Sequence, residues 1–219
     1  TDVQNLVIDE KNIGRDLLVS SQTGSGKTLA YSLSISDEIL ISKGKDSSTP
    51  SGLIITPTRE LALQVYQEIQ WLFEKTDLTA VTSIGGMDIN KERAKLKRKF
   101  NLLIGTPGRI NDHLRKKYLN LSKLSVLVLD EADEMLDLGF KEDLDKIIQS
   151  SPENSRKLLF SATLPKKIIS LANKYQKNPK RIEVSNQNVP HKDISYESYF
   201  INKKDTENAI FNLLRYYDD

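Results

Sequence analysis

The sequence predicts an α/β protein with a doubly wound, mostly parallel sheet that is covered by helices on both faces. Three observations support this prediction. Short runs that are apolar nearly throughout recur along the chain, as expected for strands buried on both faces. Segments with a helical period separate these runs. The resulting order of strand, helix and strand is typical of parallel sheets, which bind ligands beyond the carboxyl ends of their strands.

The strands are expected where the apolar runs lie. In chain order these are residues 16–20 (DLLVS), 52–56 (GLIIT), 78–84 (LTAVTSI), 101–106 (NLLIGT), 125–130 (SVLVLD), 157–162 (KLLFSA) and 181–184 (RIEV). Two of the segments between them predict helices clearly. Residues 59–75 carry an apolar stripe at helical spacing that consists of Leu61, Val65, Ile69, Leu72 and Phe73. Residues 165–176 begin with Pro165, which suits the first turn of a helix.

The chain is expected to hold one domain at residues 1–184 and the truncated start of a second at 194–219. Residues 42–52 read as a polar surface loop, and residues 185–193 (SNQNVPHKD) have the composition of a linker. Beyond the linker, residues 194–201 alternate like a strand and residues 206–217 have a helical period. The sequence also begins without Met, so we expect it to be a piece of a longer protein.

The composition excludes several kinds of site. Of 219 residues, 38% are hydrophobic and 28% are charged, which is typical of a soluble globular domain. The absence of cysteine excludes disulfides and thiolate metal sites and fits a reducing, cytoplasmic compartment. The two histidines, His113 and His191, are too far apart in sequence to favour a histidine metal site. No run approaches the roughly 20 apolar residues of a membrane span.

A phosphate-binding loop is predicted directly after the first strand, in the segment SQTGSGKT. Gly24 and Gly26 allow backbone N–H groups to surround phosphates, Lys27 supplies a positive charge, and the Thr28 hydroxyl is a ligand for Mg²⁺. The remaining positions of the loop are Ser21, Gln22, Thr23 and Ser25, with Ser21 standing where the usual pattern has Gly. The alternative is a Gly/Ser turn that caps a helix, but strand, loop and helix follow in the required order.

Three carboxylates, Asp130, Glu131 and Asp133, follow the apolar run at 125–130. Carboxylates at the end of a buried strand are costly unless a cation meets them. Asp130 is expected to hold Mg²⁺ through water, and Glu131 to orient and deprotonate an attacking water. The alternative is that these residues only start the next helix, whose dipole favours acids. The phosphate loop in the same chain favours the magnesium site.

Residues 130–133 read DEAD, and with the other motifs the sequence resembles the DEAD-box RNA helicases. SQTGSGKT is similar to motif I of that family, PTRELA (57–62) to motif Ia, GG (85–86) to its glycine doublet, TPGR (106–109) to motif Ib, and SAT (161–163) to motif III. The resemblance extends to about Val184 and implies a RecA-like P-loop domain with ATP and Mg²⁺ as cofactors. It also implies a second RecA-like domain of the same parent chain, because the family's arginine fingers lie there.

The resemblance assigns nucleotide-binding roles to individual residues. Lys27, Asp130 and Glu131 are implied as catalytic, with Thr28 and Asp130 at the magnesium ion. Gln4 lies in a segment similar to the end of the family's Q motif and would read adenine through its amide. The alternative for Gln4 is an ordinary surface glutamine. The aromatic residue that the family stacks on adenine is absent from this sequence.

The resemblance also implies an RNA-binding surface that grips the sugar-phosphate backbone without reading base sequence. The matched residues are Pro57, Thr58, Arg59, Gly85, Gly86, Thr106, Pro107, Gly108 and Arg109. The alternatives are a helix-start role for Arg59 and an ordinary turn at Pro107-Gly108. The basic segment 91–99 (KERAKLKRK) is expected to form either a solvated helix face or a further RNA contact, and His113 is expected at the surface of the helix after TPGR.

The implied function is that of a monomeric ATP-dependent RNA helicase, of which this chain holds a part that cannot complete the active site. Ser161 and Thr163 are expected to hydrogen-bond toward Asp133 and so couple the ATP site to the RNA face. One alternative is a P-loop kinase or GTPase, which has no reason to hold DEAD, SAT and TPGR together. The other is a nucleotide- and RNA-binding scaffold without helicase activity.

Overall fold

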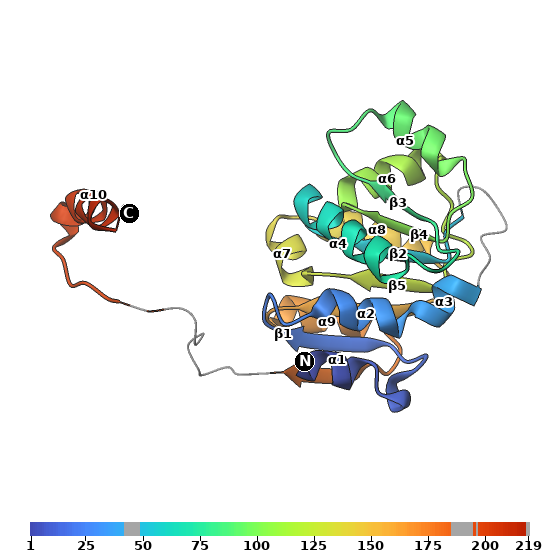
Figure 1. The fold of residues 1–219 in the computed structure, drawn as a ribbon, viewed down its shortest axis with the longest axis horizontal. Helices are drawn as coiled ribbons and strands as arrows, with labels where there is room; N and C mark the ends of the chain where they lie inside the picture. Colours follow the sequence, from blue (N-terminus) through green and yellow to red (C-terminus); the bar gives the residue numbers. More distant parts are fainter. Residues whose placement is uncertain (42–48, 185–194, 196, 218–219) are drawn as a thin grey trace. The chain divides into compact units, whose positions relative to one another are not determined.

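Seven strands form one parallel sheet in the computed structural model, which describes residues 1–41, 49–184, 195 and 197–217. The strands are β1 (Leu17–Ser21), β2 (Gly52–Ile55), β3 (Ala80–Ser83), β4 (Leu102–Gly105), β5 (Val126–Leu129), β6 (Arg156–Ser161) and β7 (Lys180–Val184). Their order across the sheet is β3-β4-β2-β5-β6-β1-β7 (Figure 1). All seven predicted strands are confirmed, with ends that shift by one or two residues.

The central strands β2, β4 and β5 are apolar throughout because both faces of the sheet are buried there. Successive side chains of a strand point to opposite faces. In β5, Val126 and Val128 join one hydrophobic core, whereas Leu127 and Leu129 join the other. Each core then needs its own layer of helices.

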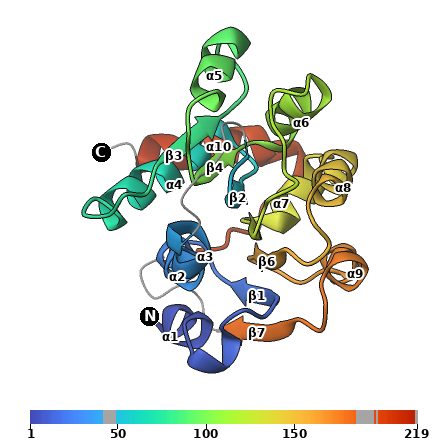
Figure 2. The same ribbon diagram turned by 90° about the vertical axis from the view of Figure 1, so that its right-hand side faces the viewer.

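Helices cover both faces, so the predicted doubly wound fold is confirmed (Figure 2). One core includes residues of α1 (Asp2–Val7), α2 (Lys27–Ser34), α3 (Ser36–Ile41) and α4 (Arg59–Leu72). The other includes residues of α5 (Ile89–Leu96), α6 (Pro107–Arg115), α7 (Ala132–Asp137), α8 (Lys141–Ser150) and α9 (Lys166–Tyr175). A short 3₁₀ segment, η1 (Glu10–Asn12), joins α1 to β1.

The two helices that the sequence predicts clearly are present. In α4, Val65 and Ile69 are fully buried, and Phe73 directly after the helix is nearly so, which confirms the predicted stripe. Helix α9 begins one residue later than predicted. Pro165 has extended backbone angles and is the N-cap residue rather than part of the first turn.

The chain divides into two compact units, Thr1–Ser185 and Asn186–Asp219. The predicted linker at 185–193 lies outside the described residues. The second unit holds η2 (Lys203–Asp205) and α10 (Thr206–Tyr216), which confirms the predicted helix. The strand predicted at 194–201 is wrong for the residues described there, 195 and 197–201, which have no regular structure. A strand needs a neighbour to pair with, and an alternating pattern alone does not supply one.

Candidate nucleotide and RNA site

The sheet order brings the sequence motifs to one edge in two groups. Strands β5, β6 and β1 lie side by side, and after them come the acidic residues, SAT and the phosphate loop. Strands β3, β4 and β2 also lie side by side, and they lead to the glycine doublet, TPGR and PTRELA. All seven strands are parallel, so both groups lie at the carboxyl edge of the sheet.

The loop between β1 and α2 has the backbone of a phosphate cradle. Gly24 and Gly26 have φ of 77° and 88°, a region that favours glycine. The Lys27 ammonium is buried and donates to the carbonyl oxygens of Ser21 (2.9 Å) and Gln22 (3.2 Å). The Lys27 charge is thus held under the loop by neutral carbonyls, and a phosphate there would supply an anion for the ammonium group to bind. The residues present therefore fit a nucleotide phosphate.

Two side chains brace this loop. The hydroxyls of Ser21 and Ser25 lie 2.5 Å apart, so the serine that replaces the usual glycine ties the two ends of the loop together. The Gln4 amide Nε2 donates to the Gly26 carbonyl at 3.3 Å. A Cβ on Gly26 would lie 2.5 Å from that nitrogen. Gln4 is therefore beside the phosphate loop, whereas adenine recognition by its amide stays a prediction.

Asp130 is the most strongly perturbed acid of the site. It is 3% exposed, and burial raises its pKa to about 6 against the attraction of the Lys27 ammonium and a hydrogen bond from Tyr31. Its Oδ2 accepts from the Tyr31 hydroxyl at 3.1 Å and its Oδ1 from the Glu131 N–H at 3.0 Å. A magnesium ion would offset the burial of this charge, so the donor set fits the metal predicted from the sequence.

Tyr31 is a site residue that the sequence interpretation missed. Its side chain lies on α2, one turn after Lys27, and it is fully buried against Phe160. Burial and the neighbouring Asp130 carboxylate raise the pKa of Tyr31 well above its ordinary value, so its hydroxyl remains a donor. The position of Tyr31 at helical spacing from Lys27 is the only signal in the sequence.

Glu131 adopts an unusual backbone conformation directly after Asp130. Its φ of 51° and ψ of 52° place it in the left-handed region at the N-cap of α7. Such a conformation costs about 1–3 kcal/mol for a residue other than glycine and is concentrated at functional sites. Within the described residues, no hydrogen bond holds the Glu131 carboxylate. That carboxylate is available to accept a proton from a water molecule.

Of the predicted contacts between SAT and DEAD, the one from Thr163 to Asp133 is present, whereas the Ser161 hydroxyl donates to another acceptor. Thr163 donates to Asp133 Oδ2 through both its backbone N–H (3.0 Å) and its hydroxyl (2.9 Å). The Ser161 hydroxyl donates to the Thr163 carbonyl oxygen at 2.6 Å. Burial acts to raise the pKa of Asp133, but the nearby hydroxyls of Ser161 and Thr163 and the Thr163 N–H outweigh it and hold that pKa below its ordinary value. The bonds between Thr163 and Asp133 thereby connect α7 to the segment that follows β6.

On the other half of the edge, Arg59 lies across the glycine doublet. Thr58 caps α4 by accepting from the Leu61 N–H at 3.2 Å, and the exposed Arg59 follows it. A Cβ on Gly86, whose φ is 80°, would lie 2.1 Å from Arg59 Nη1, and one on Gly85 would lie 3.6 Å from Nε. The doublet therefore makes room for a guanidinium group that remains open to solvent.

Arg109 and His113 share a buried partner that the sequence interpretation missed. Glu92 of α5 accepts from Arg109 Nη1 at 3.1 Å and lies 2.8 Å from His113 Nε2. The expectation that His113 is a surface residue is wrong, because it is fully buried against this carboxylate. The Arg109 side chain is only 12% exposed, and Thr106 and Pro107 are buried as well. These three residues at the start of α6 are therefore largely enclosed by the protein.

The basic segment 91–99 has its cations exposed, and Glu92 is the one acid in it and points inward. One of these cations, Arg93, stacks over the Tyr118 ring at 4.5 Å. A solvated helix face is the simpler of the two predicted interpretations, and an RNA contact there stays a prediction.

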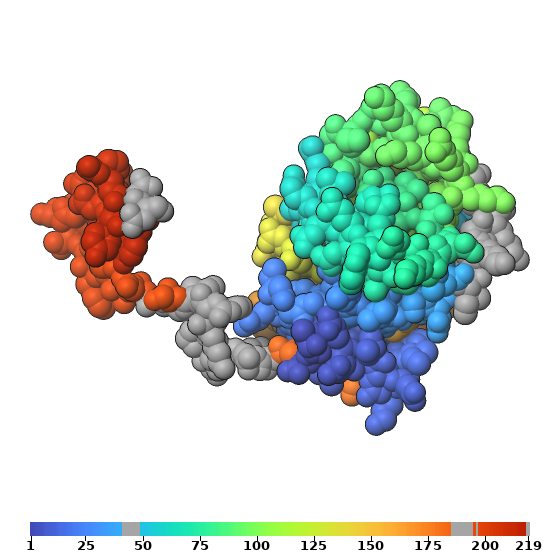
Figure 3. All heavy atoms as spheres, in the orientation of Figure 1, coloured from blue at the N-terminus to red at the C-terminus, as the bar shows by residue number. Residues whose placement is uncertain are grey.

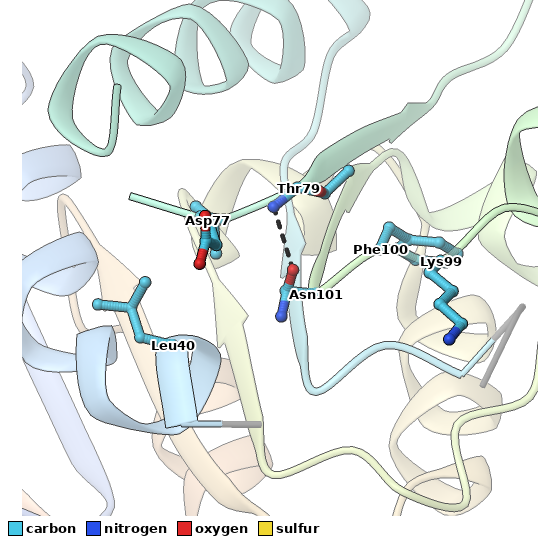
Figure 4. A pocket seen from close by; sticks show the side chains of 7 residues that line it. Leu40, Asp77, Thr79, Lys99, Phe100 and Asn101 are labelled. Carbon is cyan, nitrogen blue, oxygen red and sulfur yellow. Dashed lines mark hydrogen bonds between the residues drawn. The ribbon is translucent and has the colours of Figure 1, made fainter. Parts of the chain in front are cut away.

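A separate hollow of about 310 Å³ lies at the opposite, amino edge of the sheet. It is lined by Leu40, Asp77, Leu78, Thr79, Lys99, Phe100 and Asn101, and the Thr79 N–H donates to Asn101 Oδ1 at 3.1 Å (Figure 4). It contains none of the predicted site residues. No helix in the described part of the chain is long and apolar enough to cross a membrane.

Comparisons with known proteins agree with these motifs. Residues 1–171 match the family model for the DEAD/DEAH box helicase. The chain is 40% identical over 201 residues to the DEAD-box ATP-dependent RNA helicase RhpA of Helicobacter pylori and 41% identical over 196 residues to the ATP-dependent RNA helicase DbpA of Bacillus subtilis. These matches cover 92% and 90% of the chain, and in each case the chain spans about 40% of the relative.

A solved structure shows the same fold. The crystal structure of a DEAD box protein from Methanococcus jannaschii matches this chain with a TM-score of 0.76 and 35% sequence identity. The match covers 98% of this chain and 57% of that protein's chain. This likeness confirms a RecA-like α/β fold. The roles of the individual site residues stay predictions.

Proposed function

Since this chain belongs to the DEAD/DEAH box helicase family, we propose that it is the nucleotide-binding and RNA-binding first domain of an ATP-dependent RNA helicase. The observation that carries the proposal is the buried pair of opposite charges at one sheet edge, Lys27 under the phosphate loop and Asp130 at the end of β5. A second RecA-like domain of the parent chain would complete the site. We further propose that the parent protein acts in the cytoplasm as a monomer.

Each group of the site has a distinct task in this proposal. The N–H groups of the loop and the Lys27 ammonium would hold the nucleotide phosphates. Thr28 and Asp130 would hold Mg²⁺, which supplies charge neutralisation at the phosphates when bound. Glu131 would accept a proton from the attacking water. The bond between Asp133 and Thr163 would couple nucleotide binding at this half of the edge to the positions of Arg59 and Gly86, which bind RNA.

Binding of Mg-ADP by the 219-residue chain tests the nucleotide site. Lys27→Ala should remove most of the heat of binding in calorimetry, because it deletes the cation that faces the phosphates. Lys157→Ala is a matched control, since Lys157 is equally buried and also donates to carbonyl oxygens, but at the amino edge of β6. Equal affinity in the wild type and Lys27→Ala would refute the loop assignment.

Hydrolysis by the parent protein distinguishes the helicase from a nucleotide- and RNA-binding scaffold. Glu131→Gln keeps the size of the side chain but removes the proton acceptor. It should leave ATP affinity nearly unchanged and lower RNA-stimulated hydrolysis by about 10²–10⁴-fold. A wild-type protein that binds ATP and RNA without hydrolysis would support the scaffold.

A further inference from the structure

Helix α5 contains one buried acid in a segment whose other charged residues are basic and exposed. Glu92 is 3% exposed, whereas its neighbours Lys91 and Arg93 face solvent. In Figure 3 the green atoms, which include those of this helix, lie at one end of the first unit, and the helix packs against the edge strand β3. A buried carboxylate destabilises a fold unless it is paired and hydrogen-bonded, so its partners indicate what it holds in place.

The Glu92 carboxylate connects the loop after β3 to the first turn of α6. Its Oε1 accepts from the Ile84 N–H at 3.0 Å, directly before the glycine doublet. Its Oε2 accepts from Arg109 Nη1 at 3.1 Å, at the end of TPGR. Arg109 Nη1 also donates to the Met87 carbonyl oxygen at 3.0 Å, just after the doublet. One carboxylate and one guanidinium thereby fix the spacing between the loop that follows β3 and the start of α6, which follows β4.

His113 completes this arrangement from the next turn of α6. A carboxylate only accepts hydrogen bonds, so at 2.8 Å the His113 Nε2 carries the proton and donates to Glu92 Oε2. Within the described residues, His113 Nδ1 is buried without a partner. In the described part of the chain the imidazole therefore has one hydrogen-bond partner, and that partner is Glu92.

We propose that Glu92 is a positioning residue for RNA binding, which holds the glycine doublet and Arg109 in the relative placement that lets Arg59 reach an RNA phosphate. This inference rests on the proposed function. Arg59 lies against Gly86, so a shift of the doublet moves Arg59, although Glu92 itself is buried away from any RNA. Glu92, Arg109 and His113 affect RNA binding by fixing the position of the glycine doublet. Among the residues that the structure describes, no side-chain hydrogen bond joins them to the nucleotide motifs, so nucleotide binding should be unaffected.

Glu92→Gln tests the proposal in the 219-residue chain. Glutamine can still accept from the Ile84 N–H, but it lacks the charge and the second acceptor that hold Arg109. The Kd for a fluorescent single-stranded RNA, measured by anisotropy well below the unfolding temperature, should rise about tenfold. The Kd for Mg-ADP should stay unchanged. Glu74→Gln, which removes an exposed acid after α4, is the matched control and should change neither Kd.

Further variants decide how Glu92 acts. After Arg109→Gln, adding Glu92→Gln should weaken RNA binding little more, since coupled residues are non-additive. If Glu92→Gln does not fold, His113→Leu removes one donor and should raise the RNA Kd by about threefold. A lower unfolding temperature with an unchanged RNA Kd would mean a purely structural role and overturn the inference. A wild-type chain that binds neither RNA nor Mg-ADP would instead overturn the proposed function.

Discussion

At the residue scale, the nucleotide site places Asp130 under electrostatic strain. Its carboxylate is fully enclosed, and its pKa of about 6 lies above the ordinary value of 3.8 because burial disfavours the charged form. The partners that it has, the Tyr31 hydroxyl and the Glu131 N–H, reduce this effect but do not cancel it. The ligand-free fold is therefore less stable with Asp130 ionised than it would be with a neutral group of the same shape.

Asp130→Asn should stabilise the chain in the absence of nucleotide and divalent cations. For an acid whose pKa is raised by folding, the penalty is absent below about pH 4, grows as the pH rises and is complete above about pH 6. The rise of the Asp130 pKa from 3.8 to about 6 corresponds to a penalty of roughly 3 kcal/mol in the free energy of unfolding. The free energy of unfolding, measured with urea, should increase by about 1–3 kcal/mol near pH 8 and change little near pH 4. An equal increase at both pH values would contradict this account.

At the element scale, the loops after the strands are shaped by contacts that only the folded sheet creates. The apolar runs predicted all seven strands, and the pattern is continuous in β2, β4 and β5 because both faces of these strands are buried. Tyr31 could not be predicted, since its partner Asp130 is 99 residues away. His113 was misplaced for the same reason, because its partner Glu92 lies on another helix. The sequence motifs indicate which residues belong to the candidate site. The buried partners of those residues cannot be predicted from motifs, because they depend on how distant segments pack together.

Gly86→Ala should separate backbone strain from the placement of Arg59. Gly86 and Gly14 both have positive φ, but a Cβ at Gly14 would meet nothing within 4 Å. Each alanine should lower the free energy of unfolding by about 1–2 kcal/mol, because a Cβ is unfavourable in the left-handed backbone conformation. At Gly86 no larger loss is expected, since the flexible end of the Arg59 side chain can move aside. Only Gly86→Ala should weaken RNA binding, since only there does the methyl group displace a guanidinium group. A similar loss of RNA affinity in Gly14→Ala would contradict the role of the doublet.

At the scale of the whole first unit, strand order decides which motifs can cooperate. The nucleotide motifs follow β5, β6 and β1, the RNA motifs follow β3, β4 and β2, and the two groups meet where β2 pairs with β5. Both strands of this pair end at the carboxyl edge, with Ile55 beside Leu129. A change at Asp130 is therefore one strand away from the segment that carries Arg59. The sequence predicts the two groups of motifs, but only the pairing of β2 with β5 makes them neighbours.

The open guanidinium of Arg59 leads to the last prediction, which concerns salt. If the edge formed by β3, β4 and β2 grips phosphates, RNA binding should be indifferent to base sequence and should weaken as the salt concentration rises. Arg59→Ala should weaken binding to unrelated single-stranded RNAs by a common factor. It should also reduce the slope of log K against log salt by about 0.7, the value for one phosphate contact on a single strand.

The matched control for this measurement is Lys75→Ala, which removes the same charge from an exposed position beyond the other end of α4. It should leave the slope almost unchanged, because distant surface charges are screened within about 10 Å at ordinary salt concentrations. Equal slopes for the two variants would show that only net charge matters. A loss confined to one RNA sequence would show that this surface reads bases, and the backbone grip assigned to Arg59 would then be wrong.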